Sequence, residues 1–553
     1  MALVNLSIDL REMEFPFLAQ QKGNGAFFQD IQAAGEKPRI SWLNNLWPVS
    51  QGKWAAVTRE VSGTPGLPQA ALSSFYTDGV RCYTALVQNA RSYLLIAPNS
   101  WWSYNGVTWT EIYTPTATGY PAVFSLKAKT YIVSATEGVF EFDESDPAGL
   151  FNSIQAVSLT GITAANIFSG CAALSYMILA DEDTIYWSSP LNPTYFSPGG
   201  SGADYGAGST KVLGIQSPIT FVTGTEDGFY IFTEATVIQA TYSGDPDNPW
   251  IFQTVENSSG ALNVNYIVQQ ETLSTNFYWS ESGLALLSQG SAQYVASEVT
   301  ELLAGDILET YESAFRRPVI SQTGVVFDLQ LNFISNRYLA ISYGLTGSVK
   351  SAILVFDTVL SMWFRLNIEH LAVLEVIAPY NVGGLTFENW EQSFWDTEQS
   401  FASMFDSVTN KQTNTMAIGV LQVDGSIARL TPIRIAVSNN VQELLPNQVV
   451  IEDVRLTRSS RTELHEVTIV HSYPTFAGST GVPNTNFVGP GTQVFAQDTS
   501  QGVPTPYALG YANEREQRWV NRVQGERLTV TLENIGSFSG LNLGMRQAGR
   551  RLR

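Results

Sequence analysis

Apolar and polar positions alternate along most of this chain in short runs that end at turn residues. Between Tyr93 and Phe364 an apolar run, a Gly, Asn or Asp turn and a second run ending on an aromatic recur, as in YLLIAPNSWWSYNGVTWTEI, TYIVSATEGVFEF, YMILADEDTIYWSS, ITFVTGTEDGFYIF, NFYWSESGLALLSQG and ILVFDTVLSMWFRL. Such alternation predicts antiparallel hairpins. Hairpins that recur every few tens of residues predict a β-propeller or a related all-β array.

Two local signals refine this prediction. Asn105 and Gly106 tolerate the positive φ of a type I′ turn, so they predict a tight hairpin between SWWSY and VTWT. In the segment SAQYVASEVTELLAGDILETYESAF, the apolar residues Val295, Val299, Leu302 and Leu303 have helical spacing before a stop at Gly305, which predicts a short amphipathic helix. We therefore expect a mainly β protein with few short helices.

The pattern divides the chain into four parts. Residues 1–60 read as an N-terminal arm that packs on another part of the assembly, and residues 61–385 as the β-propeller-like domain. The unit spacing of about 38 to 61 residues allows five to seven blades or a partly irregular barrel. Residues 386–415 form a linker with an aromatic repeat, and 416–553 predict a second all-β domain with alternating strands.

The linker repeats Glu-Gln-Ser-Phe after seven residues and carries Trp390 and Trp395. It fits either an amphipathic helix with one aromatic seam or a set of aromatic-anchored arches docked on the propeller. Both alternatives make it a packing element.

Composition favours an oligomer. Aromatic residues make up 12% of the chain and charged residues only 14%. A surface with so few charges and so many aromatics is usually covered in part by a partner subunit.

Charge is unevenly distributed and acidic in total. The formal net charge is −20, yet residues 411–553 hold 14 Lys and Arg against 11 Asp and Glu, so the acid excess lies in the first 410 residues. Tight binding of nucleic acid depends mainly on cations that release phosphate counterions, which disfavours this function class. Repulsion would still let DNA pass without sticking.

Cysteine usage and the N-terminal sequence favour a protein made in a reducing compartment. Cys82 and Cys171 lie in apolar contexts without CxxC spacing and read as reduced, buried thiols. The start, MALVNLSIDLREMEF, lacks the apolar core of a secretory signal, and no run approaches about 18 apolar residues. We expect no membrane span.

Motifs for nucleotide and calcium binding are incomplete. Gly52-Lys53 is followed by Trp54 and lacks the upstream glycine of a phosphate loop. Asp245, Asp247 and Glu256 have the spacing of a calcium loop, but Trp250 stands where the loop needs glycine. Neither pattern supports a cofactor.

Signals for metal binding and hydrolysis are weak as well. The three histidines, His370, His465 and His471, lack HExxH spacing and nearby cysteines, so strand-surface positions explain them better. The cluster Asp181–Asp183 could hold an acid of raised pKa in a propeller glycosidase, although adjacent carboxylates at a hairpin tip are usually solvated. We expect no catalytic, cofactor-binding or metal-binding residues.

Several stretches, taken in order, resemble one protein family. From Tyr278 to Leu366 they are WSESGLALLSQGSAQYVASEVTELLAGDILETY, RYLAISYG and ILVFDTVLSMWFRL, where a strand ends in Phe-Asp and a Trp-containing strand returns. YWSSPLNPTYFSP, the aromatic repeat around Trp390 and Trp395, and RWVNRVQGERLTVTLENIGSFSGLNLGMRQAGRRLR extend the similarity. The chain resembles the tail hub, nozzle or packaged-DNA stabilisation proteins of short-tailed (podovirus-type) bacteriophages.

This resemblance implies a structural virion protein assembled in the host bacterial cytoplasm. It implies a homo-hexameric ring below the portal and adaptor, with a channel for genome retention and ejection and a platform for tail fibres or spikes. Double-stranded DNA would pass through the channel without sequence-specific binding. The charge asymmetry fits an acidic wall along which DNA slides.

Arginines near the C-terminal end are the candidate interface residues. Arg455, Arg458 and Arg461 are three apart, which is too irregular for one strand face, and a basic tail follows with Arg546, Arg550, Arg551 and Arg553. They are either solvated surface or salt-bridge partners for an acidic face of a neighbouring ring.

The alternative functions are a receptor- or glycan-binding propeller protein and, third, a polysaccharide hydrolase.

Overall fold

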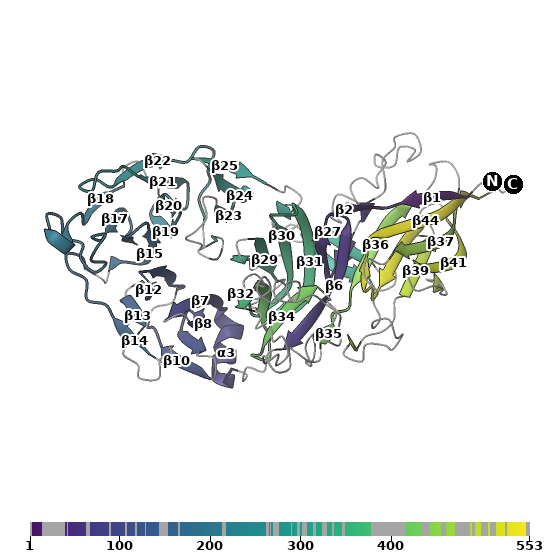
Figure 1. Ribbon diagram of the computed structural model, residues 1–553, viewed down its shortest axis with the longest axis horizontal. Helices are drawn as coiled ribbons and strands as arrows, with labels where there is room; N and C mark the ends of the chain where they lie inside the picture. The colour runs from purple at the N-terminus through teal and green to yellow at the C-terminus, as the bar shows by residue number, and fades with distance from the viewer. Residues whose placement is uncertain are drawn as a thin grey trace, which may run out of the picture.

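The structure is a computed structural model. It describes residues 3–13, 39–40, 42–61, 67–377 with short interruptions, 416–432, 442–454, 461–470, 487–488, 493–498, 507–508, 516–525 and 528–548. The chain is mainly β and forms two lobes, a β-propeller and a second all-β lobe that carries both chain ends (Figure 1). The predicted fold class is confirmed.

Seven antiparallel sheets of the described residues form the blades of the propeller. Blade 1 contains β7 (Arg81–Val87), β8 (Ala90–Ala97), β9 (Ser100–Tyr104) and β10 (Trp109–Tyr113). Blade 2 contains β11 (Ala122–Leu126), β12 (Lys129–Ser134), β13 (Gly138–Phe142) and β14 (Ile154–Ala156). Blade 3 contains β15 (Ser169–Ala173), β16 (Tyr176–Ala180), β17 (Thr184–Trp187) and β18 (Gly208–Lys211).

Blades 4 to 6 follow in chain order. They contain β19 (Ile219–Gly224), β20 (Gly228–Thr233), β21 (Val237–Tyr242) and β22 (Trp250–Thr254); β23 (Asn276–Ser280), β24 (Gly283–Ser288) and β25 (Ser291–Tyr294); and β28 (Gln330–Ile334), β29 (Tyr338–Tyr343), β30 (Lys350–Asp357) and β31 (Met362–His370). The first strand of each blade lies innermost, since β7 contacts β11 and β32, β11 contacts β15, and β15 contacts β19.

Blade 7 is completed by the N-terminal part of the chain. Its first three strands are β32 (Ala372–Ile377), β33 (Met416–Leu421) and β34 (Ile427–Pro432), and the fourth is β6 (Lys53–Val61), which pairs antiparallel with β34. A strand from the start of the chain thus closes the propeller ring. β6 also pairs with β5 (Leu46–Ser50), β35 (Gln442–Leu444) and β43 (Ser537–Phe538), so it joins both lobes.

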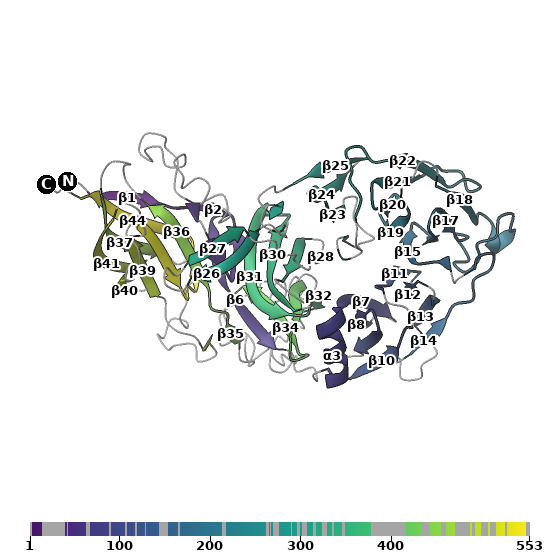
Figure 2. The same ribbon diagram turned by 180° about the vertical axis from the view of Figure 1, so that it is seen from behind.

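The second lobe is built from both ends of the chain. One sheet runs β1 (Val4–Ser7), β44 (Gly540–Gln547), β37 (Thr462–Val470) and β41 (Glu516–Gly525), and the other runs β4 (Trp42–Asn44), β36 (Gln448–Val454), β42 (Leu528–Glu533), β39 (Gln493–Asp498) and β40 (Tyr507–Ala508). The propeller is therefore an insertion within this lobe (Figure 2).

Three smaller strand pairs complete the described architecture. β2 (Asp9–Met13) pairs parallel with β3 (Arg39–Ile40), β35 pairs parallel with β38 (Phe487–Val488), and β26 (Ile307–Glu312) forms a hairpin with β27 (Arg317–Gln322). The β2–β3 and β26–β27 pairs are separate two-stranded sheets, whereas β35 and β38 extend the sheet of blade 7 beyond β6.

The sheets divide the chain differently from the predicted domains. The sequence predicts residues 1–60 to be an arm that packs on another part of the assembly, but their described part pairs with strands of the same chain, as in β1 with β44 and β4 with β36. Residues 416–432 complete blade 7 and do not belong to the second lobe. The predicted boundaries at 60 and 416 follow composition, whereas strand pairing crosses both.

One hydrophobic core runs through both lobes. It includes Phe364 of blade 6, Val420 of blade 7, Trp54 of β6, and Val530 and Leu543 of the second lobe, all at most 1% exposed. Because this core spans blades 6 and 7 and the second lobe, separating the lobes would expose a large apolar area.

A polar cluster reinforces this junction. Arg365 of β31 donates from Nε to the Tyr343 hydroxyl at 2.9 Å and from Nη1 to Asn44 Oδ1, and its guanidinium lies 4.8 Å from the ring centroid of Trp42. Asn45, at φ +54°, accepts from the Asn367 N–H at 2.7 Å. Buried polar groups of blade 6 are thus satisfied by the N-terminal segment.

Helical segments are few in the described residues. α3 (Gln69–Asp78) precedes blade 1 and ends at Gly79 with φ +78°. It packs Ala71, Leu72 and Phe75 against the strands, a spacing that could have predicted it. In the segment predicted to be helical, Val299 and Leu303 are helical and buried, whereas Val295 is not helical. Trp390, Trp395 and the linker repeat lie outside the described residues.

Candidate functional site

A cavity of about 360 Å³ lies on the propeller axis. Its lining comes from the inner strands β7, β11, β15, β19, β28 and β32, and its polar groups include Arg81, Thr223, Asn332 and Glu375. The volume suits a small molecule. A DNA duplex does not fit inside it.

Arg81 reaches across this axis. It begins blade 1, is 2% exposed, and places Nη2 3.4 Å from the Ile267 carbonyl and 3.5 Å from the Leu331 carbonyl. Leu331 belongs to blade 6 and Ile267 forms a bridge with Tyr278 of blade 5, so the side chain reaches from blade 1 past blade 7 toward the far side of the ring. Sequence reasoning missed Arg81 and Glu375 because no motif surrounds them and only ring closure brings them together.

Both cysteines line the cavity as buried thiols that form no disulfide. Burial raises the pKa of the Cys82 thiol well above its ordinary value. A thiol held in its protonated form is a poor nucleophile and a poor metal ligand. Cys82 therefore packs as a small apolar group, and Cys171 is buried in the apolar cluster between blades 3 and 4.

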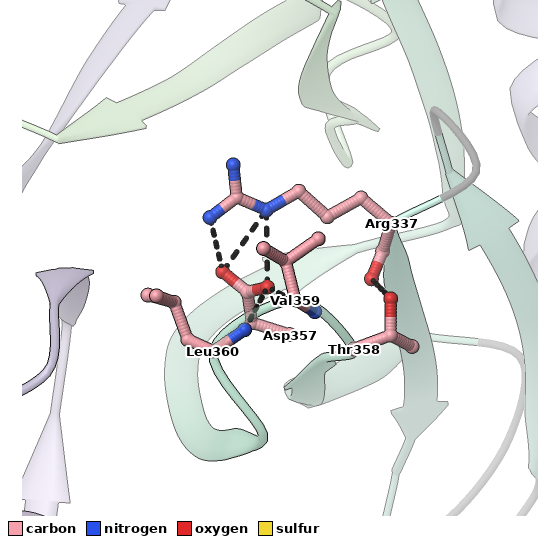
Figure 3. A network of polar contacts seen from close by, with 5 residues as sticks. All are labelled: Arg337, Asp357, Thr358, Val359 and Leu360. Carbon is pink, nitrogen blue, oxygen red and sulfur yellow. Dashed lines mark hydrogen bonds and ion pairs between the residues drawn. The ribbon is translucent and has the colours of Figure 1, made fainter.

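The Phe-Asp strand end of the family resemblance organises a turn in blade 6 (Figure 3). Asp357 is fully buried and pairs with Arg337, whose Nη2 lies 2.6 Å from Oδ2 and whose Nε lies 3.0 Å from Oδ1. Oδ1 also accepts from the N–H groups of Val359 and Leu360, and the Thr358 hydroxyl donates to the Arg337 carbonyl at 2.9 Å. The carboxylate thus ties two adjacent turns together.

The Tyr186–Pro198 signature builds a long loop of blade 3. Ser188 and Ser189 are fully buried, with the Ser188 hydroxyl accepting from the Met177 N–H at 2.9 Å and Ser189 Oγ donating to the Ala203 carbonyl at 2.6 Å. Phe196, 1% exposed, enters the core. These signature residues serve folding.

The carboxylates considered for hydrolysis do not form a raised-pKa acid at Asp183. Lys211 and the Thr184 hydroxyl both hydrogen-bond Asp183 and lower its pKa. A lowered pKa keeps the group ionised, which is the opposite of what a general acid needs.

The predicted interface arginines are only partly described. Arg546 pairs with Glu463 of the neighbouring strand at 2.8 Å, and Gln524 donates to the other oxygen of Glu463 at 2.7 Å. Burial opposes ionisation of Glu463, but these hydrogen bonds outweigh it and its pKa lies below the usual value. Arg461 immediately precedes β37, and its carbonyl accepts from the Ala548 N–H. Arg455, Arg458, Arg550, Arg551 and Arg553 lie outside the described residues.

Two of the three histidines are described, and they differ in environment. His370 is fully buried, with Nδ1 donating to the Ile368 carbonyl at 2.8 Å and Nε2 accepting from Ser342; burial lowers its pKa to about 4. His465 is partly exposed, with Nε2 3.0 Å from Glu463. The strand-surface prediction is wrong for His370, which belongs to the core.

The described residues contain neither a cluster of metal-binding side chains nor a membrane-spanning helix. No three His, Cys, Asp or Glu side chains in this part of the chain gather closely enough to hold a metal ion. No helix of the described part has the length and apolar character that a bilayer crossing requires.

Comparisons with known proteins add little to the strand pairing. No family model and no curated protein matches the chain. The N-terminal domain of Nup159 aligns with a TM-score of 0.35 and 7% identity over 71% of this chain and 99% of that chain. The extracellular domain of BT4673 from B. thetaiotaomicron aligns with a TM-score of 0.38 and 7% identity over 84% of this chain, which spans 54% of that chain.

Similarity at this level supports no statement about function. Blade order, ring closure by β6 and the axial cavity define the chain as a β-propeller protein on their own. Its propeller is carried on a second all-β lobe.

Proposed function

We propose that this protein is a structural subunit of a phage virion, a ring-forming tail hub or nozzle. Six copies would assemble below the portal and adaptor, retain and release the genome through the ring, and dock fibres or spikes. The proposal includes no catalytic step. It rests on the family resemblance together with the architecture described above.

The observation that carries the proposal is the hydrophobic core shared by the propeller and the second lobe. A ring that retains DNA under pressure needs subunits whose two lobes keep a fixed relative orientation. In this chain, β6 pairs with strands of both lobes, and Arg365 binds the N-terminal segment. Lobe motion would break these bonds and expose the core, so the protomer behaves as one rigid body.

The small size of the axial cavity supports a DNA channel that is formed between copies of the protein and does not run through the propeller. The cavity is too small for DNA, and Arg81 crosses it. At −20 per chain, six copies carry about −120, and a bore formed by their acidic surfaces repels DNA and lets it slide.

The test is the assembly state of the purified full chain. Native mass spectrometry and negative-stain imaging should show closed rings of six copies. A monomer at tens of micromolar protein, in the presence and absence of salt, would contradict the proposal.

A receptor- or glycan-binding propeller is the second candidate. Tyr205 and Tyr242, which are 43% and 41% exposed at one end of blades 3 and 4, favour it because exposed aromatics stack on sugar rings. A glycan array with the full chain tests this candidate. Specific, salt-independent binding by a monomer would support it over the ring.

A further inference from the structure

One end of blades 3 and 4 gathers exposed apolar side chains. Antiparallel pairing places the turns 174–175, 188–207, 225–228 and 243–249 at this end, which we call the blade 3–4 face. Five of the nine large apolar side chains exposed in the described residues lie here: Leu174, Leu191, Tyr205, Tyr242 and Ile251. Clustered exposure of this kind marks an interaction surface.

Closely packed aromatic rings lie beneath the blade 3–4 face. Trp250 lies 4.9 Å from Phe229, 5.5 Å from Tyr176 and 5.9 Å from Tyr242 between ring centroids. Its Nε1 is buried without a hydrogen-bond partner among the described residues. Rings fixed in this way lose little conformational entropy when a partner binds.

The loops that frame the face are also held in place. Trp187 donates from Nε1 to the Gly206 carbonyl at 3.1 Å, and Asp247 N–H donates to Asp245 Oδ1 at 3.0 Å. The side chain of Tyr205 hydrogen-bonds Asp247, which raises the pKa of the tyrosine. Blade 3 and blade 4 therefore present one preformed surface.

Acidic side chains surround these apolar groups. Asp204 and the exposed Glu226, Asp227, Asp245 and Asp247 all belong to the loops of the face. Lys127, at its edge, donates to the carbonyls of Pro190 and Leu191 at 2.6 and 2.9 Å. The complementary partner carries several cations and an apolar side chain, and arginine suits it best because guanidinium pairs with carboxylates and stacks on aromatic rings.

We propose that the blade 3–4 face binds the segment Gly549–Arg553 of a second copy of this chain. This segment offers three arginines around Leu552, whereas the preceding Arg546 is already paired with Glu463. The two elements cannot meet within one molecule. Both views place β44, from which the segment follows, at the opposite end of the protein from β17 and β18 of blade 3 (Figures 1 and 2).

A contact between opposite ends of two copies is heterologous. Such a contact repeats from copy to copy and closes into a ring or continues as a filament. The inference deepens the proposed ring by naming the surfaces that would meet, and it rests on that proposal.

Peptide binding to the full chain tests the contact directly. A fluorescent peptide of residues 546–553, RQAGRRLR, should bind the protein with an affinity that weakens as salt rises. Glu226→Gln with Asp227→Asn should weaken binding at least fivefold. The matched control is Glu182→Gln with Glu234→Gln, which removes two exposed acids from the other end of the same blades and should change binding less than twofold.

Two further variants address the arginines and the apolar contact. A peptide with Arg550, Arg551 and Arg553 replaced by Gln should bind at least tenfold more weakly, and Leu191→Ser in the protein should weaken binding about threefold. Absence of peptide binding, or equal loss in the matched control, would overturn the inference.

Assembly measurements separate this inference from the proposed function. If Arg550→Glu with Arg551→Glu leaves six-copy rings intact, the docking contact is wrong while the ring stands. If the peptide binds as expected but no variant or condition yields rings, the contact stands and the hub proposal fails.

Discussion

The two lobes differ in how their sheets are paired. In blades 1 to 6 of the propeller, each strand pairs with its neighbour in sequence, so local hairpins do most of the work. In the second lobe, β1 pairs with β44, joining Val4 to Met545. The propeller is therefore encoded locally, and the second lobe depends on contacts between the two ends of the chain.

Their buried ion pairs follow the same division. Arg337 and Asp357 are 20 residues apart and tie two turns of one blade, whereas Glu463 and Arg546 are 83 residues apart and join two strands of the second lobe. β6 is the exception that links both patterns, because it closes the propeller and pairs with strands of the second lobe. Four predictions test this comparison.

Trp54→Ala should have the largest effect because it removes a fully buried side chain from the strand shared by both lobes. Its Nε1 also donates to the Leu10 carbonyl at 2.8 Å. We expect a loss of about 4 kcal/mol, with both lobes unfolding together. Urea denaturation followed by hydrogen exchange measures this, and Leu191→Ala is the exposed control. Loss confined to one lobe would show that the lobes are independent.

Acidification should destabilise the propeller through His370. Its folded pKa of about 4 lies below the unfolded value of 6.5, so the unfolded chain takes up a proton first as pH falls. Stability from this group is full above pH 6.5 and is lost between pH 6.5 and 4, by about 3 kcal/mol in total.

Urea midpoints at pH 7, 5.5 and 4.5 measure this loss. His370→Gln should flatten the profile in that range, while the partly exposed His465→Gln should not. Equal profiles for wild type and His370→Gln would rule out this role.

Arg337→Met should destabilise blade 6 by about 2 kcal/mol, because it leaves the buried Asp357 without its cation while Arg337 itself is one-third exposed. The effect should stay local, with hydrogen-exchange protection lost around the 358–361 turn and retained in the second lobe. Adding Asp357→Asn to the Arg337→Met variant should recover part of the lost stability. A uniform loss of protection would show that the turns are not locally encoded.

Arg546→Gln should have the smallest effect, about 1 kcal/mol, since Gln524 still donates to Glu463. Because the pKa of Glu463 is lowered on folding, its contribution is present above its unfolded pKa and is lost as pH falls through its folded pKa. A double-mutant cycle with Glu463→Gln measures the coupling. Zero coupling at pH 7 would show that the pair contributes nothing to the second lobe.

The local content of the fold was predictable, including the pairing of β9 with β10, the turn-bounded strands and the buried Val299 and Leu303. The tight two-residue turn predicted at Asn105-Gly106 does not agree with the register, which pairs Tyr104 with Trp109. The candidate site was not. Arg81 and Glu375 carry no motif, and the exposed group of Leu191, Tyr205 and Tyr242 comes from two blades. The sequence placed Arg546 in a basic tail and did not reveal its partner, because Glu463 lies 83 residues away.

By itself the sequence determined the mainly β class, the recurring hairpins and the acidic excess, because alternation, turn residues and charge act over a few positions. Tertiary structure alone decided that the propeller is inserted in a second lobe, that β6 closes it and that Arg81 crosses its axis. These features depend on pairings between residues hundreds of positions apart, which local pattern does not encode.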